Sequence, residues 1–285
     1  MINTEHKDRV FKFIFGNPEH KHWTLSLYNA INGTNYQNPD DIEFNTIEDA
    51  LYLGMKNDIS FILILLNVLN MWEHQSTFNP NMPIRLFIYA ARLYDKYITS
   101  RNLYKYSRNL ITLPKPKCVC FYNGTKDQPE EIILSLSEAF GVGETDIEVK
   151  VRMLNINYGK NSELMEACKP LNEYAWLVDR IRAYNETDKD IEIAVNKALD
   201  EMPDDFVIKE FLLAHRAEVK GMFLTEYDEE KTLQQERQEG IQEANERVAM
   251  DMLRENYPLA AIKKISTLSE STIRNMANAL GLVIS

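Results

Sequence analysis

The feature that most constrains the fold is an apolar run, Ile-Ser-Phe-Ile-Leu-Ile-Leu-Leu, at residues 59–66. Because apolar residues fill both alternating positions, a strand here has to be central in a sheet that is covered on both faces. Even when extended to Leu69, the run has only about eleven residues, which is too short to span a bilayer. Asn67 stands where a tight turn would return the chain into a second strand at 69–75. The run therefore predicts a buried hairpin, and no membrane partner is expected.

Helical and extended patterns alternate around this hairpin. Helical spacing of apolar residues occurs at 8–15, 21–32 and 84–98, and extended patterns occur at 42–47, 118–122 and 150–158. This order is typical of an α/β core in which helices cover a central sheet. The pattern beyond residue 160 is helical, with segments at 162–184, 191–199 and 207–222.

We expect the chain to divide into four parts. These are a core at 1–160, a helical extension packed on the core at 161–225, an acidic long helix or linker at 226–257, and a small helical hairpin at 258–285. The two short helices of the hairpin, joined at a Ser-rich turn, resemble a helix-turn-helix. The second helix, however, offers only Arg274 as a cation. A hairpin used for assembly is therefore favoured, which predicts a homo-oligomer formed through the C-terminal helices.

The charge is distributed unevenly along the chain. The net charge is −11, but residues 1–125 contain 13 Lys and Arg against 11 Asp and Glu. Basic groups neutralise phosphates, and interleaved tyrosines add hydrogen bonds or stacking, so the segment 85–117 is a candidate surface for DNA with little sequence specificity. The alternative is a solvated helix face whose tyrosines pack inward. The candidate DNA contacts are Arg85, Arg92, Lys96, Arg101, Lys105 and Arg108.

The three cysteines indicate a reducing compartment. Cys118 and Cys120 form neither a redox Cys-x-x-Cys motif nor half of a zinc site, because no second Cys or His pair lies at ligand spacing. On a strand they would point to one face as packing groups. With Cys168 they do not make a disulfide framework, and the first residues lack an apolar signal core. A cytoplasmic protein is expected.

Two carboxylates are predicted to meet at the rim of the sheet. Side chains at i and i+2 of a strand share a face, so Glu73 and Gln75 point together while His74 points the other way. A tight return at Asn67 would bring Asp58, at the start of the preceding strand, next to Glu73. A lone Asp at a strand start is usually a solvated cap, but two adjacent carboxylates on an apolar sheet need a cation or a cluster of donors. A hard divalent ion with oxygen ligands satisfies both.

This pattern resembles that of the PD-(D/E)XK nuclease superfamily, and within it the Rpn family of recombination-promoting nucleases, often labelled transposases. The resemblance implies a restriction-endonuclease-like core, a central mixed sheet flanked by helices, with an α-helical C-terminal region. It covers about the first 125 residues. The residues that carry it are Asp8-Arg-Val-Phe-Lys12, Ile14-Phe-Gly16, Asn57-Asp58, Glu73-His-Gln75-Ser76, Arg85, Arg92-Leu-Tyr94 and Phe121-Tyr-Asn-Gly124, with Asn155-Ile-Asn-Tyr-Gly159 and Leu224-Thr-Glu-Tyr-Asp228 beyond the core.

The resemblance implies a role for each of these site residues. Asp58 and Glu73 would be direct ligands of Mg²⁺ or Mn²⁺, and Asp8 would match an acidic residue that helps to hold metal or water. Gln75 occupies the place where the superfamily has a lysine, and the Rpn family commonly shows Glu-x-Gln there. The metal would bind a phosphate oxygen and lower the pKa of an attacking water, so that phosphodiester hydrolysis proceeds near neutral pH.

The glutamine leaves a missing positive charge. Gln75 can orient water, but it offers no charge to the developing pentacovalent phosphate. The compensating cation is expected to be Lys56, which would share a strand face with Asp58, or Lys12, one helical turn from Asp8. Lys12 is favoured because it belongs to the Phe-Lys motif, although it could simply flank its helix.

Three functions compete on the sequence alone. The first is a metal-dependent DNA endonuclease with little sequence specificity, which family resemblance connects with recombination, mobile elements and defence against phage. The second is a catalytically weak or inactive relative that acts as a DNA-binding or oligomerisation module. The third, a transposase with three acidic ligands, is disfavoured because no third carboxylate has the placement that this mechanism requires.

Overall fold

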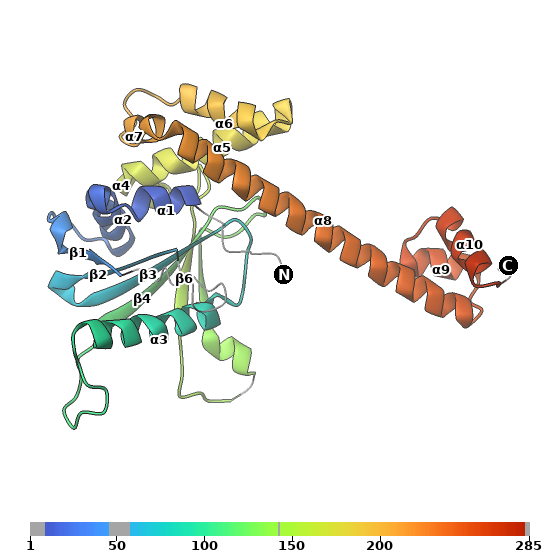
Figure 1. The fold of residues 1–285 in the computed structure, drawn as a ribbon, viewed down its shortest axis with the longest axis horizontal. Helices are drawn as coiled ribbons and strands as arrows, with labels where there is room; N and C mark the ends of the chain where they lie inside the picture. Colours follow the sequence, from blue (N-terminus) through green and yellow to red (C-terminus); the bar gives the residue numbers. More distant parts are fainter. Residues whose placement is uncertain (1–8, 46–57, 142, 283–285) are drawn as a thin grey trace. The chain divides into compact units, whose positions relative to one another are not determined.

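A computed structural model describes residues 9–45, 58–141 and 143–282 of the chain. The chain separates into two compact units, Met1–Glu226 and Tyr227–Ser285. The predicted α/β class is confirmed, because the first unit contains a six-stranded mixed sheet between layers of helices (Figure 1). The boundary lies where the acidic long helix was expected to begin.

The sheet has the strand order β1-β2-β3-β4-β6-β5. Strands β1, β2 and β3 are antiparallel neighbours, β3, β4 and β6 run parallel, and β5 is antiparallel to β6. The carboxyl ends of three parallel strands thus meet at one edge. The strands are β1 (Ile42–Phe44), β2 (Ile59–Leu63), β3 (Val68–Gln75), β4 (Lys115–Tyr122), β5 (Glu131–Ser135) and β6 (Lys150–Asn155).

The β2–β3 hairpin differs from its prediction at the turn. β2 is buried along its whole length, as expected for a central strand, but it ends at Leu63 and not at residue 66. The next residues form a 3-10 turn, η3 (Ile64–Leu66), whose side chains are exposed. Asn67 closes this turn in the left-handed conformation, with a φ of 49°. β3 begins at Val68, which pairs with Leu63. The last three apolar residues of the run therefore lie in the turn and not in the sheet.

Strand β5 has no counterpart among the predicted elements. It lies at the edge of the sheet, and most of its side chains are exposed or half-buried. A short edge strand with one covered face carries little apolar periodicity, which explains why the sequence pattern does not reveal it.

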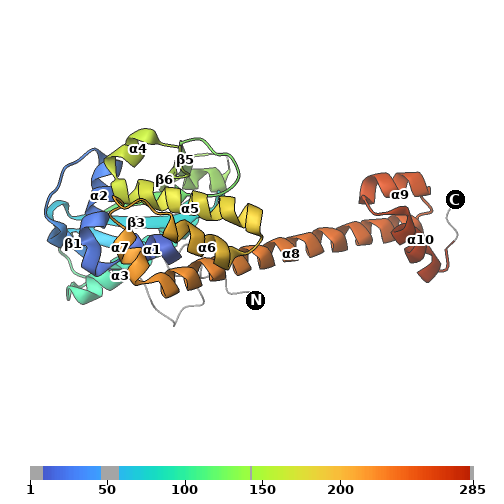
Figure 2. The same ribbon diagram turned by 90° about the horizontal axis from the view of Figure 1, so that it is seen from above.

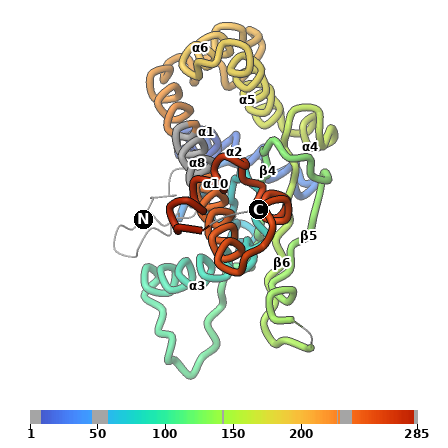
Figure 3. Tube along the Cα trace, turned by 90° about the vertical axis from the view of Figure 1, so that its right-hand side faces the viewer, coloured from blue at the N-terminus to red at the C-terminus, as the bar shows by residue number. Residues whose placement is uncertain are grey.

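Helices cover both faces of the sheet. Helix α3 (Met82–Ser100) packs on one face, where Leu86 meets alternate strand residues such as Ile62 and Met71. The opposite face carries helices α1 (Arg9–Phe15), α2 (Lys21–Asn32) and α5 (Lys169–Asp188). Figure 2 shows these three helices in front of the strands, and Figure 3 shows α3 and α5 on opposite sides of the sheet. This two-sided cover is the arrangement that the apolar run predicts.

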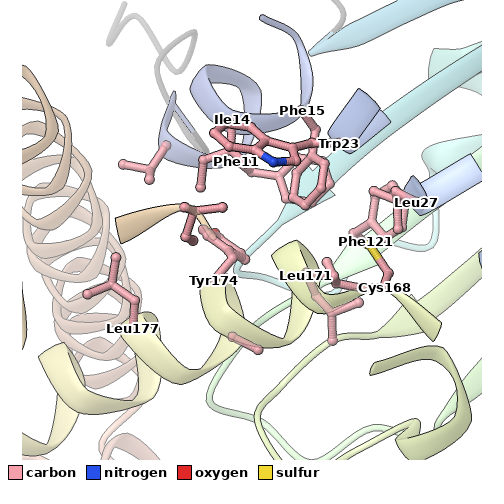
Figure 4. Packing of buried hydrophobic residues seen from close by; sticks show 14 of the residues in the cluster. Phe11, Ile14, Phe15, Trp23, Leu27, Phe121, Cys168, Leu171, Tyr174 and Leu177 are labelled. Carbon is pink, nitrogen blue, oxygen red and sulfur yellow. The ribbon is translucent and has the colours of Figure 1, made fainter. Parts of the chain in front are cut away.

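Aromatic contacts join α1 to the sheet and to α5 (Figure 4). The Phe11 ring lies 4.8 Å from Phe15, 4.9 Å from Phe121 and 5.6 Å from Tyr174, measured between ring centroids. Offset and edge-on aromatic pairs at these separations stabilise a core beyond the area that they bury. Phe11 therefore fixes the first helix over the middle of the sheet.

Two predicted helices are divided in the structure. The segment predicted at 162–184 forms α4 (Ser162–Ala167) and α5, because Pro170 cannot continue a helix and instead occupies the first turn of the next one. The helix predicted at 207–222 is interrupted after α7 (Lys209–Ala214). At this interruption the His215 ring contacts the Phe211 carbonyl (2.9 Å). A new helix, α8 (Arg216–Arg254), then crosses the boundary between the units. Helix α6 (Ile191–Asp200) agrees with its prediction.

The second unit has a core of its own. The last turns of α8 pack against α9 (Leu259–Ser266) and α10 (Glu270–Ala279), the two short helices expected here. Within the described part of the chain, no helix is both long enough and apolar enough to cross a membrane. The fully or largely buried residues of this small core are Ala249, Met252, Leu253, Ile262, Ile273 and Ala277.

A close approach at the ends of β3 and β4 requires a glycine and generates the first prediction. A Cβ atom at Gly124 would lie 2.2 Å from the Ser76 carbonyl oxygen and 2.4 Å from the Tyr122 hydroxyl. We expect Gly124→Ala to lower the free energy of unfolding of the first unit by at least about 2 kcal/mol, measured by urea denaturation. Gly221→Ala, in α8 with open space around the glycine, is the matched control and should stabilise by up to about 1 kcal/mol. Equal effects of the two substitutions would contradict this account.

Candidate functional site

Asp58 and Glu73 lie side by side, as the hairpin predicts. The antiparallel register pairs Ile59 with Trp72, so the next pair outward is Asp58 with Glu73. The Asp58 backbone N–H donates to Glu73 Oε1 (3.2 Å), and the His74 backbone N–H donates to Asp58 Oδ2 (2.8 Å). The Glu73 side chain is only 1% exposed, whereas Asp58 is half-buried. Two carboxylates therefore meet at the end of an apolar hairpin, one inside the protein and one at its rim.

Arg85 from α3 lies over the buried carboxylate. Its Nη2 atom is 2.9 Å from Glu73 Oε2 and 3.4 Å from the Tyr89 hydroxyl. Glu73 points toward α3 because it shares a strand face with Met71, which belongs to the α3 side of the core. Arg85, one of the predicted DNA contacts, thus has its guanidinium turned toward the acidic site and paired with Glu73; its contact with DNA stays a prediction.

Gln75 completes a three-residue arrangement with Arg85. With the amide oriented so that both of its ends find a partner, its oxygen accepts from Arg85 Nη1 (2.6 Å) and its nitrogen donates to the Thr77 carbonyl (3.1 Å). The opposite amide orientation would place NH₂ hydrogens against the guanidinium, donor against donor. The guanidinium therefore contacts both Glu73 and Gln75, which places a positive charge beside the amide.

The electrostatics of the cluster favour this pairing. Burial acts most strongly on Arg85 and would lower its pKa, but Glu73, Tyr89 and Asp58 together outweigh it, so the pKa lies above its ordinary value. Burial, followed by the carboxylate of Glu73, raises the pKa of Tyr89. Arg85 is therefore always charged, and Tyr89 stays a neutral phenol that can donate or accept a hydrogen bond.

His74 lies on the other face of the sheet, as its position in the strand predicts. Its Nε2 atom is 3.1 Å from the Tyr174 hydroxyl, and its ring packs 4.8 Å from Phe11. The ring is thus held in the core under α1 and α5, away from Glu73. Its backbone N–H, which donates to Asp58, takes part in the site.

The remaining predicted residues of the site divide between described and undescribed parts of the chain. Asp8 and Lys56 lie outside the described residues. Lys12 lies in α1, near the end of β2 that carries Asp58, since Gly16 at the end of that helix approaches Ile59. No hydrogen bond or ion pair joins Lys12 to a carboxylate of the described residues. Among the described residues, Arg85 is a cation in contact with Glu73, and the role expected of Lys12 stays a prediction.

The cations of α3 form a stripe along one flank of the helix. Arg85, Arg92 and Lys96 are spaced by seven and four residues, which places them on the same side of an α-helix over about 16 Å. Lys96 is exposed, and its Nζ lies 3.4 Å from the Asn45 carbonyl oxygen. The stripe begins at the acidic pair and continues along the surface away from it.

The other predicted DNA contacts follow α3 in an exposed loop (Figure 1). Two of them have acidic partners, since Arg101 is 2.7 Å from Glu43 and Lys105 is 2.6 Å from Asp95, while Arg108 is exposed. The tyrosines of the segment separate into two groups. Tyr89, Tyr94 and Tyr97 pack beneath α3, whereas Tyr104 and Tyr106 are exposed at 67% and 76%.

The carboxyl ends of β4 and β6 carry a second polar cluster that the sequence did not predict. Arg182 of α5 donates to the side chains of Asn123 (2.8 Å) and Asn157 (3.1 Å), and also to the Asn123 backbone carbonyl. Asn157 in turn donates to the Gly124 carbonyl (3.0 Å). These contacts join the Tyr-Asn-Gly and Asn-Ile-Asn motifs into one clamp across two strands. The amide residues were visible in the sequence, but their arginine comes from a distant helix with no local signal.

The donor set of the acidic pair suits a hard divalent cation. Mg²⁺ is typically held by one or two carboxylates and keeps several waters, with substrate phosphates as further ligands. Asp58 and Glu73 provide two carboxylates, and Asp58 is accessible at the rim. Among the described residues, no group of three or more His, Cys, Asp and Glu side chains could hold a metal ion. The two carboxylates would therefore share the ion with water and phosphate.

The proximity of two carboxylates generates a second prediction. Like charges directly opposite each other on neighbouring strands are destabilising. In buffer without divalent cations, we expect Asp58→Asn to raise the free energy of unfolding by up to about 1 kcal/mol, since the asparagine oxygen can still accept from the His74 N–H. Glu131→Gln, which breaks an exposed pair with Arg152 (2.8 Å), is the control and should not stabilise the protein. Loss of stability in Asp58→Asn, measured by urea denaturation, would contradict the repulsion.

The site thus unites three predicted residues, Asp58, Glu73 and Gln75, with an arginine that was predicted for another surface. Its chemistry has to be argued from these side chains. No protein-family model, no curated protein and no solved structure matches the chain.

Proposed function

We propose that the chain is a metal-dependent DNA endonuclease that hydrolyses phosphodiester bonds with little sequence specificity. The observation that carries this proposal is the in-register pair of Asp58 and Glu73 with the Arg85 guanidinium beside it. Two carboxylates and one fixed cation, placed at the end of a strand, are the groups needed to bind a divalent ion and a phosphate together. The six-stranded mixed sheet between helices is compatible with the PD-(D/E)XK core that the sequence resembles.

The stripe on α3 supports DNA as the substrate. Arg92 and Lys96 extend from the site along one flank of the helix and can neutralise successive phosphates of a strand that crosses the acidic pair. The negative net charge of the whole chain does not oppose this, because residues 1–125 are slightly basic. Backbone contacts of this kind position a nucleic acid without reading its bases, so low sequence specificity follows.

Each residue of the site has a place in the hydrolysis. Asp58 and Glu73 would hold Mg²⁺ or Mn²⁺, which supplies a Lewis acid for a phosphate oxygen and lowers the pKa of a bound water. Gln75 can orient the attacking water through its amide. The water oxygen bonds to phosphorus, the bond to one ester oxygen breaks, and that oxygen leaves with a proton. A guanidinium near the phosphate stabilises the charge that develops in this step.

Cleavage of supercoiled plasmid tests the proposal and gives the third prediction. Purified protein with Mg²⁺ or Mn²⁺ should nick or linearise the plasmid, and EDTA should prevent this. We expect Asp58→Ala and Glu73→Ala to lower the rate by about 100-fold or more, because each removes a direct ligand of the ion. His74→Gln, in the same strand but facing the core, is the matched control and should retain cleavage. Cleavage that survives both ligand substitutions would exclude this site.

The second unit supports the alternative in which assembly or DNA binding dominates. It has its own small core, and it leaves apolar side chains such as Ile265 and Tyr257 half or more exposed. On α10 the cation Arg274 is already paired with Glu270 (2.8 Å), which leaves little charge for phosphate contact. We therefore propose that this unit serves homo-oligomer formation more than DNA binding.

The oligomeric state gives the fourth prediction. The full chain should form a dimer or larger assembly in light scattering, and a truncation that ends at Glu226 should be smaller by at least a factor of two in subunit number. The truncation keeps the complete first unit, so its circular dichroism should show a folded α/β protein. A monomeric full chain, or an unchanged assembly after truncation, would refute oligomerisation through these helices.

A further inference from the structure

We propose that Arg85 is an exchangeable counter-ion of Glu73: it occupies the carboxylate until a divalent cation binds, and it then serves as the phosphate-binding cation that the glutamine of the Glu-x-Gln motif cannot provide. This inference rests on the proposed nuclease function and adds a named residue and a regulatory step to it. It also explains why the motif can lack a lysine on the strand.

The first argument is the competition for one oxygen. Glu73 Oε2 accepts from Arg85 at 2.9 Å, and its other oxygen already accepts from the Asp58 N–H. A cation bound between Asp58 and Glu73 would approach the same Oε2 atom and meet the guanidinium, because two positive groups cannot share one carboxylate oxygen without repulsion. Binding of the ion therefore has to displace Arg85 from Glu73.

The second argument is that Arg85 has a second anchor. Its Nη1 atom binds the Gln75 amide oxygen at 2.6 Å, independently of the contact to Glu73. When the Glu73 contact is lost, the guanidinium can remain attached to Gln75 at the carboxyl end of β3. The N–H groups released from Glu73 could then donate to a phosphate at the site. A lysine on α3 would hold two strand residues less well, because its ammonium lacks the rigid planar fork that a guanidinium presents to two acceptors at once.

The third argument concerns burial. Glu73 is 1% exposed, and loss of the cation beside a buried carboxylate leaves a buried charge without compensation. The Arg85 side chain is 37% exposed, so it can move outward at lower cost than its partner. Arg85 thus protects the fold when no metal is present, and the exchange of one cation for another keeps the buried charge compensated throughout.

Arg85→Met tests the exchange with a binding measurement besides activity. The substitution removes the charge-assisted hydrogen bond between Arg85 and Glu73, which the ion would otherwise have to displace. The affinity for Mn²⁺, measured by titration calorimetry, should therefore rise by roughly tenfold. The same variant should cleave plasmid about 100-fold more slowly, since the phosphate loses its cation. In EDTA its melting temperature should fall below that of the unmodified protein, and saturating Mn²⁺ should raise it by a larger increment than in the unmodified protein.

Arg254→Met, which breaks an exposed pair with Asp251 in the second unit, is the matched control and should change neither Mn²⁺ affinity nor cleavage. Arg85→Lys guards against misfolding of the methionine variant: it keeps the charge, and its Mn²⁺ affinity and cleavage should lie between those of the unmodified protein and of Arg85→Met. Unchanged or weaker Mn²⁺ binding by Arg85→Met, or its undiminished cleavage, would overturn the exchange while leaving the nuclease proposal intact. Absence of Mn²⁺ binding and cleavage in all variants would instead refute the nuclease function, and the exchange with it.

Discussion

The register of the β2–β3 hairpin is the constraint on which the rest of the site depends. Asn67 closes the turn in the left-handed conformation, and the pairing of Leu63 with Val68 sets every later pair. A slip of one residue would move each side chain of β3 to the opposite face. Glu73 would then enter the aromatic core beside Phe11, and His74 would face α3. Burial of apolar side chains on both faces of the sheet therefore fixes the register, and the register fixes the positions of the two carboxylates.

The acidic pair contradicts the local rules that the rest of the sheet follows. Every residue of β2 is buried, and most of β3 is buried too, yet β3 contains a carboxylate with almost no access to water. Such a group needs a cation or a cluster of donors, and Arg85 supplies a cation from a different element. Sites where a local preference is violated and compensated from elsewhere are where function is expected. The positive charge that compensates Glu73 comes from α3. The apolar pattern of the hairpin alone would not favour a carboxylate at this position.

Sequence patterns predicted the hairpin, the flanking helices and the side-by-side placement of Asp58 and Glu73, because strand parity and a tight turn are local properties. They also placed His74 correctly on the far face. They did not predict that Arg85 turns into the site, since its spacing on α3 is equally compatible with an open basic surface. The pairing depends on how α3 packs across β3, which is a tertiary contact. The Arg182 clamp was missed for the same reason, whereas β5 was missed because a short edge strand carries little apolar periodicity.

The position of the cation on α3 has a consequence for specificity and for rigidity. Leu86, Tyr89 and Leu93 pack α3 onto the sheet, and Arg85 lies one turn before Tyr89 on the same helix. Arg92 continues the basic stripe from that helix, so one rigid element sets both the charge at the acidic pair and the line along which phosphates would lie. Any shift of α3 would move these groups together and preserve their spacing. Because the cation is carried by the helix, binding of the nucleic-acid backbone along α3 is coupled to the chemistry at Glu73. A lysine on the strand would not move with α3, so the two would be independent.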